Sequence, residues 1–172
     1  SRVEEVERRV RDKSRKSKEK LRKLEEDVRR ESETSRDRLR KLAEEVKTKV
    51  KELKDKRVPK EEVEERVRRI ERRLEETLKD LRRRYEEVER RLKKALEDLR
   101  REHEKVKDEL RRGEIDSEDL KRLAKEIEDN LEELERKIRE IRKELRRSLE
   151  EVEKTVEDLK RELKKVLDEL RK

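Results

Sequence analysis

A stripe of apolar and small polar residues with a constant period runs along almost the whole 172-residue chain. Its steps of three, four, four, three and four residues add up to 18 residues over five turns, so that Val3, Leu21 and Leu39 are equivalent. A heptad pattern started at Val3 would instead place Lys13 and Lys20 in the core. A period of 18 residues over five turns equals 3.6 residues per turn, which predicts nearly straight helices without a supercoil.

Two junctions divide the stripe into three segments, because the chain contains one proline, Pro59, and one glycine, Gly113. Pro59 suits the first turn of a helix, and Gly113 suits the end of one. Asp116 is the predicted N-cap of the last segment, and Ile115 and Leu120 flank it with the spacing of a hydrophobic staple. Connections this short make each helix run antiparallel to the one before it.

Composition alone would suggest disorder, because 65% of the residues are charged and 26% are hydrophobic. The stripes argue against disorder, because each segment has one continuous apolar face that a three-helix bundle would bury. About 54 residues in each helix would span about 80 Å. We therefore predict an all-α protein with a single domain over residues 1–172. The expected architecture is an antiparallel up-down-up three-helix bundle with long, nearly straight helices at about residues 2–57, 59–112 and 117–171.

Polar residues interrupt the stripes at matched depths. Antiparallel partners have residue numbers with a constant sum, which is near 117 across the first junction and near 233 across the second. This matching predicts two polar layers, Ser14, Ser17, His103 and Asn130 in one and Ser32, Ser35, Tyr85 and Ser148 in the other. An equivalent apolar layer contains Val50, Leu53, Val67 and Val166, although the stripe of the third segment itself passes through Leu167. Thr77 and Thr155 are predicted to form a smaller polar pair.

The polar layers are not expected to exist for stability. A buried hydroxyl or amide without a partner costs about 1–3 kcal/mol, whereas a satisfied hydrogen bond contributes only about 1 kcal/mol. A perfect apolar repeat could slide by one repeat, or pair its helices in the wrong order, at little cost. Layers with different hydrogen-bonding groups penalise those alternatives. We therefore predict that Ser14 and Ser17 fix the register by facing His103 and Asn130.

A serine and a histidine in one layer also raise the possibility of a hydrolase, with Ser14 or Ser17 as nucleophile and His103 as base. No carboxylate lies on the stripes to orient the imidazole, and no glycine-containing turn offers an oxyanion hole. One histidine with hydroxyls and an amide also falls short of a metal site. We expect no enzyme activity, no catalytic residue, no cofactor and no metal. A pH switch through protonation of His103 is a weaker alternative.

The charge of the chain is uneven. The net charge is +8, and residues 11–23 contain eight lysines and arginines against Asp12 and Glu19. Such a run could attract nucleic acid or anionic lipid, but it lacks interleaved aromatic residues. We therefore expect a solvated helix surface, with some of its charge facing the acidic third segment. No partner and no nucleic-acid binding are expected.

No segment resembles a membrane span or a targeting signal. No apolar run approaches the roughly 18 residues that a span requires, and no signal-peptide core is present. There is no cysteine, which excludes a disulfide framework and a thiolate metal site. We expect a soluble protein without membrane association, obtained by recombinant cytoplasmic expression.

The combination of these features resembles a family of de novo designed proteins. The chain resembles parametrically generated, untwisted three-helix bundles with buried hydrogen-bond networks. The features that it shares with them are a strict 18-residue period, short capped junctions, a Leu/Val/Ile core, Glu/Lys/Arg surfaces and matched polar layers. The resemblance covers the whole chain, whereas spectrin-like repeats have shorter helices and characteristic core aromatics that are absent here. It implies a hyperstable monomeric scaffold with no evolved biochemical function. The alternative is an interaction rod that self-associates or presents its basic first helix to an acidic partner.

Overall fold

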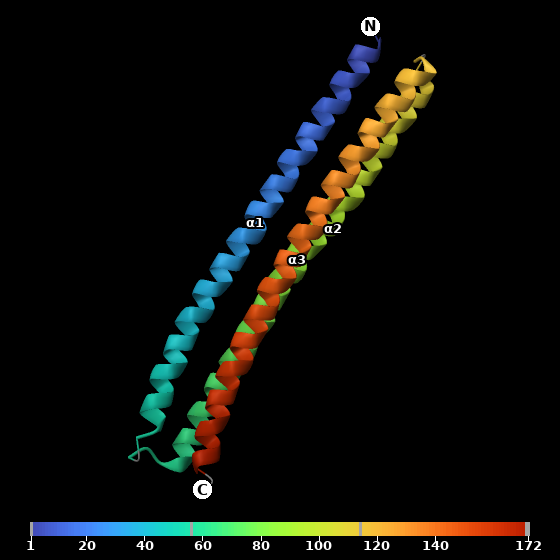
Figure 1. Ribbon diagram of the computed structural model, residues 1–172. Coiled ribbons are helices and arrows are strands. Elements are labelled where there is room, and N and C mark those ends of the chain that lie inside the picture. Colours follow the sequence, from blue (N-terminus) through green and yellow to red (C-terminus); the bar gives the residue numbers. More distant parts are fainter. Residues whose placement is uncertain (1, 56, 114, 171–172) are drawn as a thin grey trace. The chain divides into compact units, whose positions relative to one another are not determined.

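The computed structural model of this protein describes residues 2–55, 57–113 and 115–170. It contains three long helices, α1 (Arg2–Leu53), α2 (Lys60–Arg112) and α3 (Ser117–Leu170), and no strand occurs in these residues (Figure 1). The predicted all-α three-helix fold is therefore confirmed. The predicted end of the third helix at residue 171 lies outside the described residues.

α1 ends at Leu53, before the predicted end near residue 57. The carboxylate of Asp55 accepts a hydrogen bond from the backbone N–H of Arg57 at 3.1 Å, which competes with continuation of the helix. Pro59 then disfavours a helical conformation for Val58. The carbonyl oxygen of Pro59 accepts the first hydrogen bond of α2, so this proline lies at the N-cap rather than inside the first turn.

The second junction begins where the sequence predicts it. α2 ends at Arg112, and the N–H of Gly113 donates to the carbonyl of Glu109 at 3.1 Å. Gly113 has no positive φ, so it ends the helix without the left-handed conformation that glycine often supplies. The carbonyl of Asp116 accepts the first hydrogen bond of α3, from Leu120 at 2.9 Å, which places Asp116 at the N-cap.

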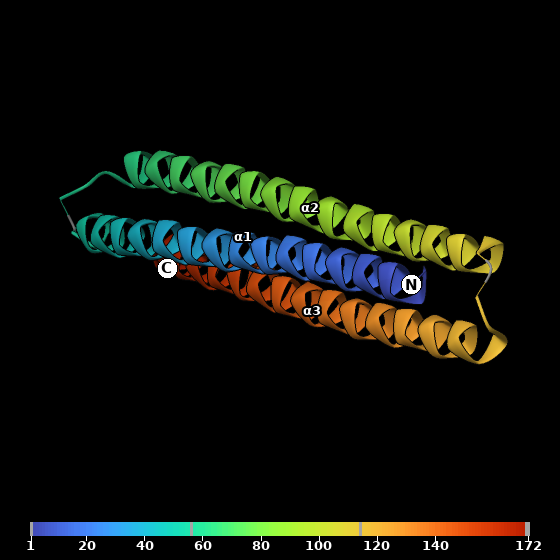
Figure 2. The same ribbon diagram turned by 90° about the horizontal axis from the view of Figure 1, so that it is seen from above.

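Contacts divide the chain into two compact units, and every helix contributes a segment to each. Unit 1 contains Ser1–Val28 and Val88–Glu144, and unit 2 contains Arg29–Glu87 and Leu145–Lys172. Within each unit the three helical segments run side by side (Figures 1 and 2).

Ion pairs join all three pairs of helices in unit 1, namely Arg9–Glu109, Glu7–Arg122 and Arg100–Glu135. In unit 2 they are Glu45–Arg73, Arg36–Glu151 and Arg82–Glu153.

The buried hydrophobic residues follow the 18-residue stripes. Unit 1 has one buried cluster that contains Val10, Val106, Leu110, Leu123 and Ile127, and another that contains Leu21, Leu99, Leu134 and Ile138. Ile115 and Leu120 pack against the first cluster from the second junction, as expected of a staple. Each cluster draws residues from all three helices, so the core of this unit lies between them.

The last turns of α3 depart from the predicted stripe. Val166 is buried, whereas Leu167, which the spacing assigns to the core, is only half-buried. The sums of residue numbers assign Val166 to the predicted apolar layer, whereas the 18-residue spacing assigns Leu167 to the core. The sums therefore identified the residue that is buried. Adjacent positions at the edge of a helix face differ in burial with a small rotation of the helix.

Candidate functional site

Three members of the first polar layer surround one small cavity in unit 1. Ser14 of α1, His103 of α2 and Asn130 of α3 all line a space of about 10 Å³. Lys13 and Glu102 line it from the same two helices as the serine and the histidine. A space of this size corresponds to about one water molecule. Of these three residues, His103 is buried, whereas Ser14 and Asn130 are half-buried.

The imidazole of His103 is oriented by its own helix. Its Nδ1 lies 2.7 Å from the carbonyl oxygen of Leu99, one turn earlier in α2. Because a carbonyl can only accept, Nδ1 carries the hydrogen and donates it. In the neutral imidazole, Nε2 is then an acceptor. No hydrogen bond joins His103 to a serine among the described residues.

Ser17 lies apart from the rest of its predicted layer. Its side chain is buried, with 2% exposure, but it lines a different space between α1 and α2. No side-chain hydrogen bond connects Ser14, Ser17 or Asn130 to another residue in the described part of the chain. The predicted four-member layer therefore divides into three residues around the cavity and one in a neighbouring groove.

The second polar layer, in unit 2, contains one direct hydrogen bond. The hydroxyl of Tyr85 on α2 lies 2.5 Å from the hydroxyl of Ser148 on α3, and either oxygen can donate. Both residues are buried. Ser35 of α1 is fully buried, but its hydroxyl has no hydrogen-bond partner, and Ser32 is half-buried. The layer thus contains one bonded pair, which joins α2 and α3, and no hydrogen bond connects the serines of α1 to it in the described residues.

The predicted pair of threonines does not form a direct bond. The hydroxyl of Thr155 donates to the carbonyl of Glu151 on its own helix at 2.9 Å. Thr77 is buried, and no bond between the two threonines occurs among the described residues. A local carbonyl one turn earlier is always within reach of a helical threonine, so it competes with partners on other helices.

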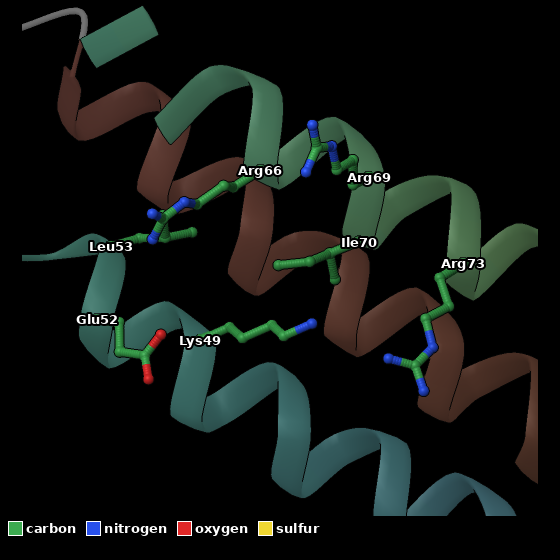
Figure 3. Close-up of a pocket in the computed structure, with 7 residues that line it drawn as sticks. All are labelled: Lys49, Glu52, Leu53, Arg66, Arg69, Ile70 and Arg73. Carbon is green, nitrogen blue, oxygen red and sulfur yellow. The ribbon is translucent and has the colours of Figure 1, made fainter. Parts of the chain in front are cut away.

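Two grooves between α1 and α2 were not predicted. The first, in unit 2, has a volume of about 310 Å³ and a floor of Leu53 and Ile70 (Figure 3). Lys49 reaches over this floor from α1, and Arg66 and Arg73 extend toward α1 from α2 (Figure 3). The three arginines of its lining are all paired with carboxylates, in the pairs Arg66–Glu62, Arg69–Glu65 and Arg73–Glu45.

The second groove lies in unit 1 and has a volume of about 300 Å³. We call it the Ser17 groove. Its α1 residues are Ser17, Lys20, Leu21, Lys23 and Leu24. Its α2 residues are Arg91, Lys94, Ala95, Asp98, Leu99 and Glu102. The sequence signal for this groove is the presence of two small residues, Ser17 and Ala95, on facing helices.

The Arg38–Asp80 pair gives unit 2 a titratable contact between α1 and α2. Nη1 of Arg38 donates to Oδ2 of Asp80 at 2.6 Å. This hydrogen bond, together with the charges of Arg38, Arg84 and Arg83, lowers the pKa of Asp80 below its ordinary value, against a smaller opposing effect of desolvation. The carboxylate form therefore favours the folded chain above the ordinary pKa, and that contribution is lost as the pH falls through the lowered pKa.

Replacing Arg38 with glutamine is expected to raise the pKa of Asp80 toward its ordinary value, because the strongest stabilising partner of the carboxylate is removed. An NMR titration of the Asp80 side-chain carboxyl gives the midpoint directly. Arg40→Gln is the matched control, because Arg40 pairs with Asp37 rather than Asp80. Equal midpoints in the Arg38 variant and the unmodified chain would contradict the assignment.

Other site classes have little support in the described residues. No group of three or more histidine, cysteine, aspartate or glutamate side chains that could hold a metal ion occurs there. No helix in the same residues is long and apolar enough to cross a membrane. Within the basic run of residues 11–23, Arg15 forms an ion pair with Asp12. No cation of this run pairs with an α3 carboxylate in the described part of the chain.

Comparison with known proteins places the fold. No model of a protein family matches the chain, and no curated protein matches it. A solved structure described as a computationally designed three helix bundle aligns with 98% of this chain and 86% of its own, with 21% sequence identity and a TM-score of 0.52. This likeness shows that the chain has the fold of a three-helix bundle. The resemblance to designed three-helix bundles that the sequence predicts is thus also found by structure.

Proposed function

We propose that the chain is a designed structural scaffold, a very stable monomer whose buried polar layers specify the register and topology of its helices. The observation that carries this proposal is the bond between Tyr85 and Ser148, two buried residues on different helices. The fold shared with a computationally designed bundle supports the part of the proposal that concerns design. In this proposal the chain has no evolved biochemical activity and is not an enzyme.

The contribution of Tyr85 to register follows from the repeat. A slip of α3 by one 18-residue repeat would bring Val166 to the position of Ser148. The Tyr85 hydroxyl would then be buried beside an aliphatic side chain, and a buried hydroxyl without a partner costs about 1–3 kcal/mol. The apolar contacts that remain in the overlap would be similar, so the lost hydrogen bond of this hydroxyl adds to the cost of the shorter overlap. The bond therefore favours one register over its neighbour.

The cavity beside His103 extends the same argument to unit 1. A single water molecule there would donate to Nε2 of His103 and reach the hydroxyl of Ser14 and the amide of Asn130. That gives the water three polar partners, which is the usual number for a buried water. The three helices would then be linked at one depth by groups that an apolar layer cannot replace.

Replacement of both polar layers by valine and leucine tests the register proposal. We expect the unmodified chain to scatter light as a single species of 21.4 kDa and to give one set of amide NMR signals. The apolar variant should give several species or several sets of signals, because alternative registers and helix pairings no longer bury unpaired hydroxyls. A control with Val50→Ile and Val67→Ile changes core volume without changing polarity, and should remain a single species. An apolar variant that stays uniform would refute the role in register.

The same measurement addresses the alternative, an interaction rod that self-associates or binds an acidic partner through α1. The observation that favours this alternative is the basic run of residues 11–23, where only Arg15 forms an ion pair within the described residues. A doubled mass would support self-association. Added single-stranded DNA serves as the acidic probe, and a rise in mass that disappears with salt would support charge-mediated binding.

A further inference from the structure

The Ser17 groove exists because two helices that face each other each have a small residue along its length. Ser17 replaces the leucine that the stripe would carry on α1, and Ala95 stands on α2 where most off-stripe positions are charged. The space that remains between them has a floor of Leu21, Leu24 and Leu99. A groove of about 300 Å³ lies at the lower end of ligand-site volumes, so it suits a small molecule.

The charges around this groove are arranged in order along its length. Because α1 and α2 are antiparallel, Lys23 lies level with Lys94, whereas Ser17 lies toward Asp98 and Glu102. Lys20, Lys23 and Lys94 form no ion pair in the described part of the chain. The end at Lys23 and Lys94 is therefore cationic, and the end at Asp98 and Glu102 has a net negative charge even with Lys20 near the level of Asp98.

We propose that the Ser17 groove binds a small amphiphilic anion, with medium-chain carboxylates as the chemical class. The carboxylate lies between Lys23 and Lys94, and the alkyl chain extends over Leu21 and Ala95 toward Ser17. Burial of the alkyl chain provides most of the affinity, because it removes apolar surface of both partners from water. The unpaired lysines select an anionic head group, and Asp98 and Glu102 oppose the reversed orientation.

The groove of Figure 3 is a natural comparison, because its volume is nearly the same. Its arginines already pair with Glu45, Glu62 and Glu65, so an incoming anion would have to displace these carboxylates. Lys49 is the one cation of that groove that forms no ion pair in the described residues, whereas the Ser17 groove has three such lysines, Lys20, Lys23 and Lys94. We therefore expect an amphiphilic anion to prefer the groove in unit 1.

Titration with sodium octanoate, followed by amide NMR, tests this proposal on the full chain. We expect saturable shifts confined to the neighbourhood of residues 17–24 and 91–102, with a dissociation constant of about 1 mM for so small a ligand. Octanol, which has the same chain without the charge, should bind about two- to fivefold more weakly, because an exposed ion pair contributes little.

Two pairs of variants separate the groove from general effects. Ala95→Leu fills the groove and should weaken octanoate binding by at least about tenfold, because the alkyl chain loses its place. Ala124→Leu is the control, since Ala124 also lies off the stripe in unit 1 but does not line the groove. Lys94→Gln should weaken binding about two- to fivefold, whereas Lys41→Gln, with the same net charge, should not.

Several outcomes would overturn the proposal. Amide shifts that spread along all three helices without saturation would mean that octanoate binds nonspecifically to the surface of the chain. Equal binding to the Ala95→Leu variant would place the alkyl chain elsewhere. Equal affinity for octanol and octanoate, together with no effect of Lys94→Gln, would remove the lysines from the site. Lys94 is exposed, so its variant remains a valid test even if filling the groove disturbs the fold.

Discussion

Replacing Leu92 with alanine is expected to lower the free energy of unfolding by about 2–5 kcal/mol. Leu92 lies on α2 within unit 1 and has 0% exposure, so the change removes buried methyl groups and leaves a cavity among the three helices. The loss is measured from guanidinium unfolding followed by circular dichroism. The amide protection of residues around Leu92 should fall in parallel, because the cavity is local.

Leu96 provides the matched control for this experiment. It lies one turn later on the same helix and in the same unit, but it is only half-buried. Leu96→Ala is therefore expected to cost about 1–2 kcal/mol, since less apolar surface is returned to water. Equal losses at the two positions would mean that the apolar face of α2 is rotated relative to the contacts described here.

Two serines of the same polar layer are expected to respond with opposite signs. Ser35→Ala should raise the free energy of unfolding by about 1–3 kcal/mol, because its fully buried hydroxyl has no hydrogen-bond partner and its desolvation is uncompensated. Ser148→Ala should lower it by about 1–3 kcal/mol, because the buried hydroxyl of Tyr85 loses its partner. Both changes remove one oxygen atom, so the difference isolates the hydrogen bond.

A double-mutant cycle checks the assignment of this bond. Tyr85→Phe removes the other hydroxyl, so the cost of Ser148→Ala should become much smaller in the Tyr85→Phe background. Ser35→Ala should have the same effect in both backgrounds, because Ser35 forms no bond with Tyr85. A destabilising Ser35→Ala would show that its hydroxyl has a partner in solution, and would contradict the structure at that site.

The fold could be predicted from the sequence in most respects, because one physical pattern dominates it. Burial of a 3.6-residue stripe determines which face of each helix lies inside, whatever the exact packing. The errors occur where local interactions compete with that pattern. The carboxylate of Asp55 bonds to the backbone and ends α1 at Leu53, while Val166 replaces Leu167 in the core.

The candidate site was predictable in position but not in its bonds. The sums of residue numbers predict which residues lie at the same depth along the helices. The length of each side chain then determines which atoms come within hydrogen-bond distance. Tyr85 is long enough to reach Ser148, whereas the hydroxyl of Ser35 stands one bond from its Cβ and meets no partner. His103 bonds to the nearby carbonyl of Leu99 on its own helix. The grooves depend on volumes that spacing does not encode.

The placement of two unique residues makes the halves of this molecule separately observable. The chain contains one tyrosine, no tryptophan and one histidine. Tyr85 belongs to unit 2 and His103 to unit 1, and both are buried. Near-ultraviolet emission therefore comes from a single phenol in unit 2, while a single pair of imidazole proton resonances reports on unit 1. One unlabelled sample can thus reveal whether the two units open together or one before the other.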